Sequence, residues 1–235
     1  MTSFDGLLLV DKPSGPTSHD IVDRVRRALG IRAVGHAGTL DPFASGLLIL
    51  GVGKGTKRLT ALVGHDKTYE IEARLGQRTD TFDREGQPLG TPHQGEPPSR
   101  DTIEALLPHF RGTIQQKAPL YSAIKRQGKK LYELARAGTA TEDMRPIREV
   151  TIHELELLEY VWPTLKLRAR VSSGTYIRSL VDDIGTELGT GAFVQELRRT
   201  RVGELDVANA IDGDHLSLES ISAALQTETP ARAGV

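Results

Sequence analysis

The sequence predicts an α/β fold of the α+β kind, built on a long mixed sheet that is mainly antiparallel. Strand-like segments come in pairs rather than alternating singly with helices, which argues against a doubly wound sheet. Residues 67–75 alternate between apolar and polar side chains, as a strand with one buried face does. Two other segments repeat their apolar residues at the helical period. The 235 residues suffice for one large core or two modest ones.

The first half of the chain supplies two strands and a well-marked helix. Residues 6–10 form a short apolar strand, and the apolar run at 47–50 is a buried one. Thr17 and Ser18 open the helix, with Asp20 placed for a capping box, and Gly30 ends it. The later elements, in chain order, are a helix at 99–110, strands at 150–157 and 165–171 joined through 161–163, and a helix at 176–188. Residues 86–98 and 127–148 are loops, the second with a short helix at 129–136.

Composition excludes several classes of protein. The chain has no cysteine, so disulfides, thiolate nucleophiles and cysteine zinc sites are excluded. Its seven histidines are scattered, and we expect neither a metal nor a small-molecule cofactor. No apolar run is long enough for a membrane span, and residues 1–5 lack a signal segment, so we expect a cytoplasmic protein. The glycine-rich run at 51–57 fails as a phosphate loop because Gly55 follows its lysine.

The distribution of charge is more informative than the net charge of -1. Basic residues gather in three groups: nine between Arg111 and Arg148, four at Arg24, Arg26, Arg27 and Arg32, and three at Arg198, Arg199 and Arg201. The chain after Val202 is acidic instead. Such a distribution suits a protein that follows phosphates on one face, although for each group taken alone a solvated surface is the favoured explanation.

Residues 35–46, with the sequence GHAGTLDPFASG, are the most informative segment. Glycines and a proline predict a turn rather than a regular element, and the turn leads into the apolar run at 47–50. A carboxylate on a constrained loop at the mouth of a buried strand suits a catalytic acid. The alternative is that Asp41 only caps the turn, since Asp before Pro favours turn initiation.

This segment resembles the catalytic signature of the TruB family of tRNA pseudouridine synthases. The resemblance extends from about residue 6 to about residue 211. Its further motifs, in the family's order, are DKPSG at 11–15, KTYE at 67–70, RLGQRTDT at 74–81, PLYSAIK at 119–125, GTYIR at 174–178 and LRRT at 197–200. The fold implied is that of the pseudouridine synthases. The activity implied is isomerisation of uridine to pseudouridine at position 55 in the T-loop of tRNA, after the base is flipped out of its stack.

The resemblance assigns catalytic roles to three residues. Asp41 is the essential carboxylate, Tyr69 the ring that stacks on the extruded uracil, and Arg178 the partner of the carboxylate. Each role has a structural alternative. Tyr69 lies on the apolar face of its strand and suits a core position. Arg178 falls in the first turn of a helix, where the macrodipole disfavours a cation, yet a surface pair with Asp182 one turn on would also explain it.

Further contacts with the substrate are implied for His36, Tyr176, Leu197 and Lys12. His36 would contact RNA where the target nucleotide leaves its stack, and Tyr176 and Leu197 would be pocket walls. Lys12 would have a supporting role, and a surface pair with Asp11 or another acid is its alternative. Residues 117–148 match an insertion that closes over the RNA arm. There we expect contacts with the RNA backbone from Lys125, Arg126, Lys129 and Lys130.

The sequence therefore predicts a catalytic domain at residues 1–225 and a flexible tail at 226–235, with too few residues after the matched region for the C-terminal RNA-binding PUA domain of many bacterial relatives. We expect a monomer whose partner is the T-arm stem-loop of tRNA. Two alternatives stay open: a non-catalytic chaperone that refolds tRNA arms, and a synthase acting on another RNA stem-loop.

Overall fold

The structure, a computed structural model, describes residues 4–122, 124–126 and 128–226, apart from the side chain of Arg126. The chain forms two compact units. Unit 1 joins Met1–Tyr69 to Arg198–Val235, and unit 2 is Glu70–Leu197. Strands β4 (Lys67–Leu75) and β12 (Ala192–Val202) each begin in one unit and end in the other.

The sheet of unit 1 is built around β3 (Ser45–Val52), whose residues after Ser45 are apolar or glycine and are all buried. Strand β1 (Gly6–Lys12) pairs with it antiparallel along its whole length, and β2 (Val34–His36) pairs with its last residues. The end of β12 pairs with the start of β3 in parallel. Strand β14 (Ile211–Asp212) adds a second parallel pair beside β1, and β13 (Leu205–Asp206) pairs with β12. This part of the sheet is therefore mixed.

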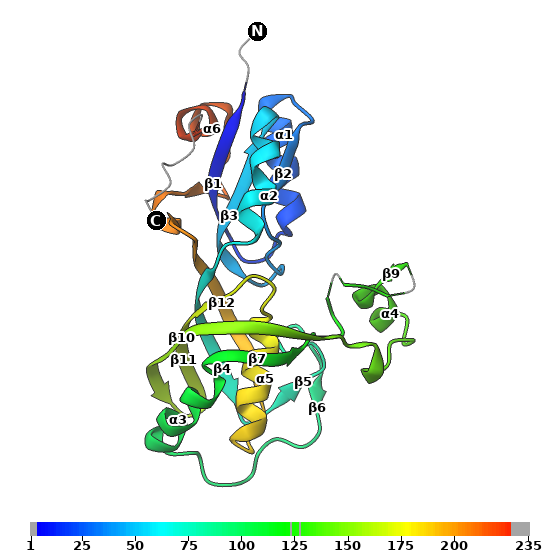
Figure 1. Ribbon diagram of the computed structural model, residues 1–235, viewed down its shortest axis with the longest axis vertical. Helices are drawn as coiled ribbons and strands as arrows, with labels where there is room; N and C mark the ends of the chain where they lie inside the picture. The colour runs from blue at the N-terminus through cyan, green and yellow to red at the C-terminus, as the bar shows by residue number, and fades with distance from the viewer. Residues whose placement is uncertain (1–3, 123, 127, 227–235) are drawn as a thin grey trace. The chain divides into compact units, whose positions relative to one another are not determined.

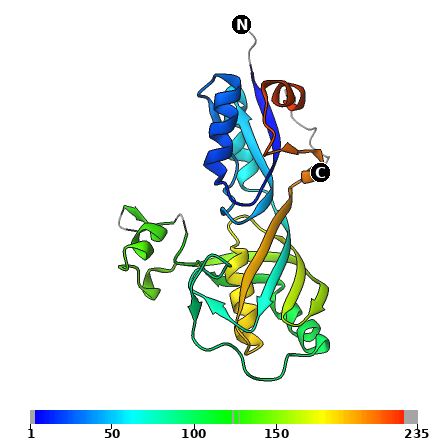
Figure 2. The same ribbon diagram turned by 180° about the vertical axis from the view of Figure 1, so that it is seen from behind.

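Helix α1 (Ser18–Leu29) covers unit 1 next to β2 (Figures 1 and 2). The predicted capping box is present: the Thr17 side chain accepts from the Asp20 backbone, and Asp20 accepts from the Thr17 backbone at 2.7 Å. Gly30 ends the helix with a φ of 65°, a left-handed conformation that favours glycine. The shorter helices are η1 (Gly53–Arg58), α2 (Leu59–Val63), η4 (Val207–Asn209) and α6 (Leu218–Ala224), the last beside β1.

The sheet of unit 2 has the strand order β12-β4-β11-β10-β7. Strands β10 (Ile147–Val161) and β11 (Thr164–Val171) form an antiparallel hairpin, and β7 (Gly112–Lys117) pairs antiparallel with the start of β10. Helix α5 (Ile177–Glu187) buries an apolar face formed by Ile177, Leu180, Val181 and Ile184. Helix α3 (Arg100–Leu106), capped by Ser99, continues into η2 (Leu107–Phe110). Strands β5 (Arg78–Thr79) and β6 (Pro88–Leu89) form a separate small pair.

The insertion lies between β7 and β10. It contains a hairpin of β8 (Lys125–Arg126) and β9 (Lys129–Lys130), helix α4 (Leu131–Arg136) and the short η3 (Glu142–Met144). Within α4 only Leu131 is fully buried, so this small element has little core of its own.

The predicted fold class is confirmed, since a large mixed sheet is flanked by helices. The strand at 67–75 has the predicted bounds and the predicted buried face. Two expectations need correction. The turn at 35–46 begins inside β2 and ends inside β3, and the strand expected at 150–157 starts at Ile147 and ends at Val161. Strands β7 and β12 were not predicted. Of the expected tail, only Gln226 is described, and it pairs with Leu7.

Candidate active site

Asp41 lies in the turn between β2 and β3, and serine side chains of unit 1 hold the backbone on both sides of it. The Ser18 hydroxyl accepts from the Leu40 backbone N–H at 2.9 Å and donates to the Leu40 carbonyl at 3.1 Å. The Ser14 hydroxyl donates to the Phe43 carbonyl at 2.7 Å. A loop whose backbone groups are satisfied in this way is held in one conformation, which a catalytic carboxylate needs.

Lys12 supports the same turn through hydrogen bonds to main-chain carbonyls. Its side chain is fully buried, and Nζ donates to the carbonyls of Pro13 at 2.8 Å, Pro16 at 2.7 Å and Pro42 at 3.2 Å. Burial lowers the pKa of Lys12 to about 8, against the opposing effect of the Asp41 charge. The surface ion pair considered for Lys12 is therefore wrong. Its ammonium group binds main-chain carbonyls, one of them next to Asp41.

Arg199 is a second buried cation of this region, whereas the sequence placed it in a basic group suited to phosphates. It is 1% exposed, and it donates from Nε to the Leu47 carbonyl at 2.8 Å and from Nη2 to the Gly38 carbonyl at 3.2 Å. It therefore connects the turn to β3. The third basic group predicted from the sequence needs correction, because a buried Arg199 cannot contact phosphate and Arg198 forms a bidentate pair with Asp11 at 2.9 and 2.6 Å.

His36 is half-buried in β2. Burial lowers its pKa, and the positive charge of Arg199 acts in the same direction, so the ring is neutral near pH 7. Its Nδ1 atom is buried and has no hydrogen-bond partner among the described residues. Among the described residues, no hydrogen bond to Nδ1 therefore explains the position of the ring.

Tyr69 lies on the buried face of β4 and is 8% exposed. The predicted inward position of Tyr69 is confirmed, and its stacking on uracil stays a prediction. Lys67, two residues earlier on the same face, is also buried and donates to the carbonyls of Val63 and His65, each at 2.6 Å. Burial lowers the pKa of Lys67 to about 8.

Arg178 occupies the first turn of α5 in unit 2, as predicted, and is 4% exposed. Its Nη1 donates to the Thr81 carbonyl at 2.8 Å and lies 3.3 Å from the Asp83 carboxylate, and its Nη2 donates to the Tyr121 carbonyl at 2.8 Å. These acceptors offset the unfavourable helix dipole. The guanidinium is therefore held in one plane by groups outside its own helix.

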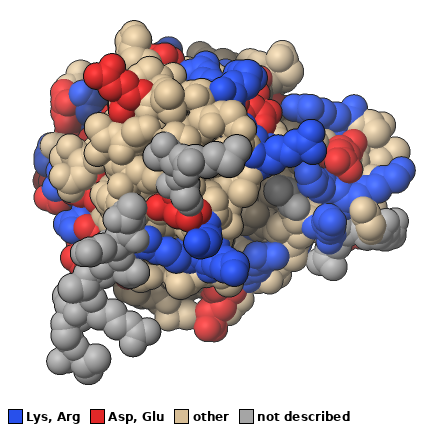
Figure 3. All heavy atoms as spheres, turned by 90° about the horizontal axis from the view of Figure 1, so that it is seen from above, with Lys and Arg blue, Asp and Glu red and all other residues tan. Residues whose placement is uncertain are grey.

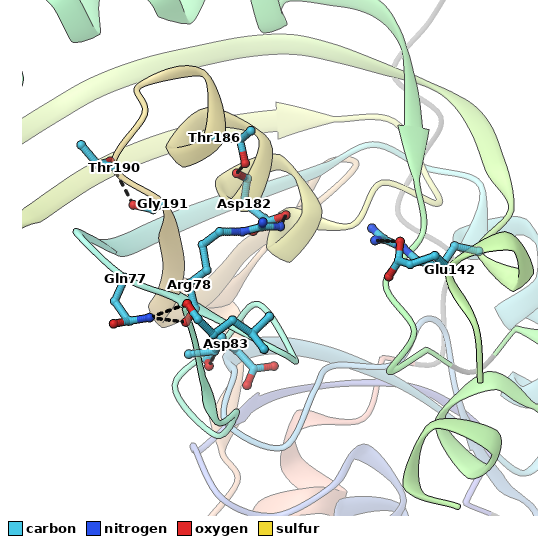
Figure 4. A network of polar contacts seen from close by, with 11 residues as sticks. Gln77, Arg78, Asp83, Glu142, Asp182, Thr186, Thr190 and Gly191 are labelled. Atoms are coloured by element: carbon cyan, nitrogen blue, oxygen red, sulfur yellow. Dashed lines mark hydrogen bonds and ion pairs between the residues drawn. The ribbon is translucent and has the colours of Figure 1, made fainter. Parts of the chain in front are cut away.

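The alternative of an Arg178–Asp182 surface pair does not hold, because Asp182 is buried and binds Arg78. Arg78 donates from Nε and Nη2 to the two carboxylate oxygens at 2.7 and 2.8 Å (Figure 4). The neighbouring Asp183 is also affected by this environment. Burial, followed by the charge of Asp182, raises the pKa of its carboxyl to about 6.

The loop that supplies Thr81 and Asp83 is itself held to β12. Phe82 has a φ of 63°, a conformation that residues with a side chain seldom adopt. Its carbonyl accepts from the Val194 N–H at 3.0 Å, and the Arg84 N–H donates back to the Val194 carbonyl at 2.9 Å. Such strain persists only where the surrounding contacts enforce it, and it often accompanies function.

Of the two predicted pocket walls, Leu197 is 6% exposed on β12 and Tyr176 is half-buried at the N-cap of α5. Tyr176 gives its helix no side-chain cap. The cap comes from Gln116 on β7, which is 1% exposed and bonds to both backbone groups of Tyr176. Sequence reasoning missed Gln116, because a lone glutamine in a polar strand carries no recognisable signal.

The described lysines among the insertion residues expected to contact RNA are accessible to a ligand. Lys125 and Lys129 are exposed and Lys130 is half-exposed, whereas the side chain of Arg126 lies outside the described part. The ammonium of Lys130 lies 5.4 Å from the centre of the Tyr132 ring. On the face shown in Figure 3, Lys and Arg side chains gather on the right-hand side of the view. This distribution fits the predicted contact with phosphates.

Unit 2 also contains a cavity of about 340 Å³ at the root of the insertion, lined by Arg78, Asp80, Phe82, Leu120, Arg145 and others. Within residues 4–122, 124–126 and 128–226, no three His, Cys, Asp or Glu side chains gather as metal ligands would. No helix in the same residues is long and apolar enough to cross a membrane.

Two family models match the chain in succession. The model of the N-terminal domain of TruB family pseudouridylate synthases matches residues 26–177, and that of the C-terminal domain of tRNA pseudouridylate synthase B matches residues 178–232. A tRNA pseudouridine synthase B from Azoarcus sp. (strain BH72) is 47% identical over 225 residues, which are 94% of this chain and 72% of that protein. The corresponding protein of Pseudomonas syringae pv. syringae (strain B728a) is 48% identical over 214 residues, 91% of this chain and 69% of its own.

Solved structures give the same result for the fold. A chain from a crystal structure of a Cbf5-Nop10-Gar1 complex is 32% identical, with a TM-score of 0.68 over 89% of this chain. A chain from an H/ACA RNP bound to a substrate RNA containing 2'-deoxyuridine is 30% identical, with a TM-score of 0.66 over 88% of this chain. This chain spans about half the length of each, 52% and 50%.

Proposed function

Because the chain belongs to the TruB family of pseudouridylate synthases, we propose that it isomerises uridine to pseudouridine at position 55 in the T-loop of tRNA. The observation that carries this proposal is the pair of family models, which together match residues 26–232. The T-loop and the position of the nucleotide come from the family resemblance of the motifs. We further propose that the protein acts in the cytoplasm as a monomer.

The reaction asks the protein for positioning and proton transfer. The N1–C1′ bond of uridine breaks and a C5–C1′ bond forms, while C5 loses a proton and N1 gains one. The atoms and electrons balance within the nucleotide, so the isomerisation consumes neither water nor a redox partner. A carboxylate at the reacting atoms and an environment that excludes water are what the chemistry needs.

We assign the essential carboxylate to Asp41. Its support is the held turn, in which Ser14, Ser18 and Lys12 bind the neighbouring backbone. A carboxylate on such a turn is preorganised, and preorganised charges are the most effective in catalysis. Three chemical roles stay open for it: attack on C1′, addition to C6 of the base, and removal of a proton from the sugar.

The other site residues keep the roles that the family resemblance implies. Tyr69 stacks on the flipped uracil, as aromatic rings do for extruded bases, and Arg178 is the partner of the catalytic carboxylate. His36, Tyr176, Leu197 and Lys12 form or support the nucleotide site. The support from their geometry is burial of Tyr69, Leu197 and Arg178 together with a neutral, half-buried His36.

We propose that the basic insertion holds the RNA backbone through Lys125, Arg126, Lys129 and Lys130. Exposure of Lys125 and Lys129 supports this part of the proposal. Phosphate contacts fix the position of the RNA without reading its sequence, so selection of the T-arm rests on the shape of the loop and on the nucleotide site.

The test is to incubate the purified protein with an unmodified tRNA transcript and to map pseudouridine at single-nucleotide resolution. We expect pseudouridine at position 55 and none in a transcript that carries cytidine there. Pseudouridine in another loop would move the proposal to a different RNA substrate. Binding and refolding of tRNA without any pseudouridine would instead show an RNA chaperone.

A further inference from the structure

The start of helix α5 is held by a side chain from another element. Gln116 on β7 is 1% exposed, and its Oε1 accepts from the backbone N–H of Tyr176 at 2.8 Å. Its Nε2 donates to the Tyr176 carbonyl at 3.0 Å. The orientation of the amide is fixed by these partners, because a backbone N–H can only donate and a carbonyl can only accept.

These two hydrogen bonds from Gln116 act on the N-cap residue of α5, where the helix begins. Tyr176 is the N-cap residue of α5, and its carbonyl also accepts the first helical bond, from the Leu180 N–H at 3.1 Å. N-cap positions are usually stabilised by Ser, Thr, Asp or Asn at the position itself. Here the residue at the N-cap is a tyrosine without a capping side chain, and Gln116 fixes its peptide groups instead.

Gln116 also lies close in sequence to Tyr121, whose carbonyl accepts a hydrogen bond from Arg178. The Tyr121 carbonyl, which accepts from Arg178 Nη2 at 2.8 Å, lies in the loop that follows β7, after residues 118–120. The Ser179 hydroxyl donates to the Lys117 carbonyl at 2.9 Å in the same stretch. The position of Arg178 relative to its acceptor at Tyr121 therefore depends on how the first turn of α5 is aligned with residues 116–121.

We propose that Gln116 is a positioning residue of the isomerase, acting through Tyr176 and Arg178. This inference rests on the proposed function. Gln116 itself does not touch the nucleotide. Its amide fixes the backbone of one proposed pocket wall, Tyr176, and aligns the guanidinium of Arg178 two residues further along the helix. Displacement of a reacting group by about 1 Å can lower a rate about 100-fold, so such alignment has a measurable effect.

The experiment compares three variants of the full chain. Gln116→Leu removes both bonds to Tyr176. Gln116→Glu keeps the acceptor for the Tyr176 N–H but places a carboxylate oxygen against the Tyr176 carbonyl. Gln115→Leu is the matched control, because Gln115 is the same residue type on the same strand and is exposed, and the one described hydrogen bond of its side chain is a 3.4 Å contact with Glu149.

Two quantities are measured for each variant: hydrogen exchange of the peptide containing residues 174–181, and the single-turnover rate of pseudouridine formation together with the affinity for tRNA. For Gln116→Leu we expect faster exchange in that peptide, a rate lowered about 100-fold, and an affinity within about twofold of the parent. Gln116→Glu should be slow at high pH and recover as the pH falls, because burial raises the pKa of the introduced carboxyl and the protonated acid again donates to Tyr176. Gln115→Leu should match the parent in both measurements.

The inference is overturned if exchange rises in Gln116→Leu while the rate stays within about twofold of the parent, since Gln116 would then be only a helix cap. It is equally overturned if exchange in residues 174–181 does not change, or if Gln116→Glu shows no recovery at low pH. Should Gln116→Leu not fold, Gln116→Glu decides the question. An inactive parent would refute the proposed function, whereas the exchange data would still report separately on the cap.

Discussion

Two glycines of the segment that carries Asp41 allow the effect of its backbone geometry on stability to be measured. Gly46 and Gly38 both have left-handed backbones, with φ of 100° and 88°. They differ in the space around them. A Cβ on Gly46 would overlap the carbonyl oxygen of Arg199 and lie 2.8 Å from its backbone nitrogen, whereas a Cβ on Gly38 would lie 3.6 Å from the Arg199 side chain. Alanine at the two positions therefore separates backbone strain from steric overlap.

The expected magnitudes follow from this difference. The left-handed conformation costs an alanine about 1–2 kcal/mol relative to glycine, so Gly38→Ala should destabilise the protein by that amount. Gly46→Ala carries the same strain, and in addition β3 and β12 must separate, since Gly46 pairs with Arg199 and a backbone atom cannot rotate away. Overpacking of this kind adds about 1–3 kcal/mol or more. The total for Gly46→Ala is then about 2–5 kcal/mol.

Thermal unfolding followed by circular dichroism tests the comparison. For a chain of this size 1 kcal/mol corresponds to about 2–4 °C in Tm. Gly46→Ala should therefore unfold several degrees below Gly38→Ala, and below the parent by more. Both variants should form pseudouridine more slowly than the parent, since both disturb the turn of Asp41. Equal Tm values for the two variants would refute the reasoning, because the overlap with the Arg199 backbone would then have no energetic effect.

Four further outcomes are expected. Asp41→Asn keeps the size of the side chain and removes its charge, so pseudouridine formation should be lost while tRNA binding is retained; near-normal turnover would remove Asp41 from the mechanism. Arg178→Lys keeps the charge but not the planar fork, so activity should fall sharply with an unchanged circular dichroism spectrum, and a fully active lysine variant would contradict the assignment. Changing Lys129 and Lys130 together to Ala should weaken tRNA binding and lower the slope of log affinity against log salt by about two, with little change in Tm; an unchanged slope would show that the insertion does not contact the RNA backbone. Because the pKa of Asp183 is raised to about 6 in the folded chain, above its value in the unfolded chain, the stabilisation that it contributes is complete below the unfolded pKa and is lost as the pH rises through about 6. The Tm of Asp183→Asn relative to the parent should therefore increase from about pH 4 to about pH 8, and a decrease would contradict the raised pKa.

The elements that could be predicted from the sequence are those with one apolar face. Strand β4 and helices α1 and α5 each bury side chains at a regular period, so the pattern alone gave their type and nearly their ends. Strands β12 and β7 could not be found in this way. In β12 the fully buried Arg199 interrupts the apolar pattern, and in β7 the one fully buried residue is Gln116.

The candidate site shows the same division. The motif around Asp41 and the place of Arg178 in a first helical turn were evident from sequence, because the glycine and proline signals of a turn and the apolar period of a helix are local. The supports of these residues were not. Lys12 and Arg199 are charged, and charged side chains are rarely buried unless paired. Their partners are main-chain carbonyls, which no sequence pattern displays, so only the three-dimensional structure identifies them as supports of the turn.

The buried cations of both units share one arrangement. Lys12, Lys67, Arg199 and Arg178 each donate to two or more main-chain carbonyls. Burying a cation costs several kcal/mol, and each hydrogen bond from a charged donor returns about 1.5–3 kcal/mol. Two or three such hydrogen bonds are therefore needed to compensate the cost of burying one cation. The carbonyls that accept them lie in turns that are poor in regular hydrogen bonds. The contribution of these cations to stability is small, and their effect is to fix backbone geometry, as at the turn of Asp41 and around the guanidinium of Arg178. A substitution that keeps the positive charge of such a residue but changes the length of its side chain loses some of these hydrogen bonds. It should therefore lower the rate of pseudouridine formation more than the free energy of unfolding.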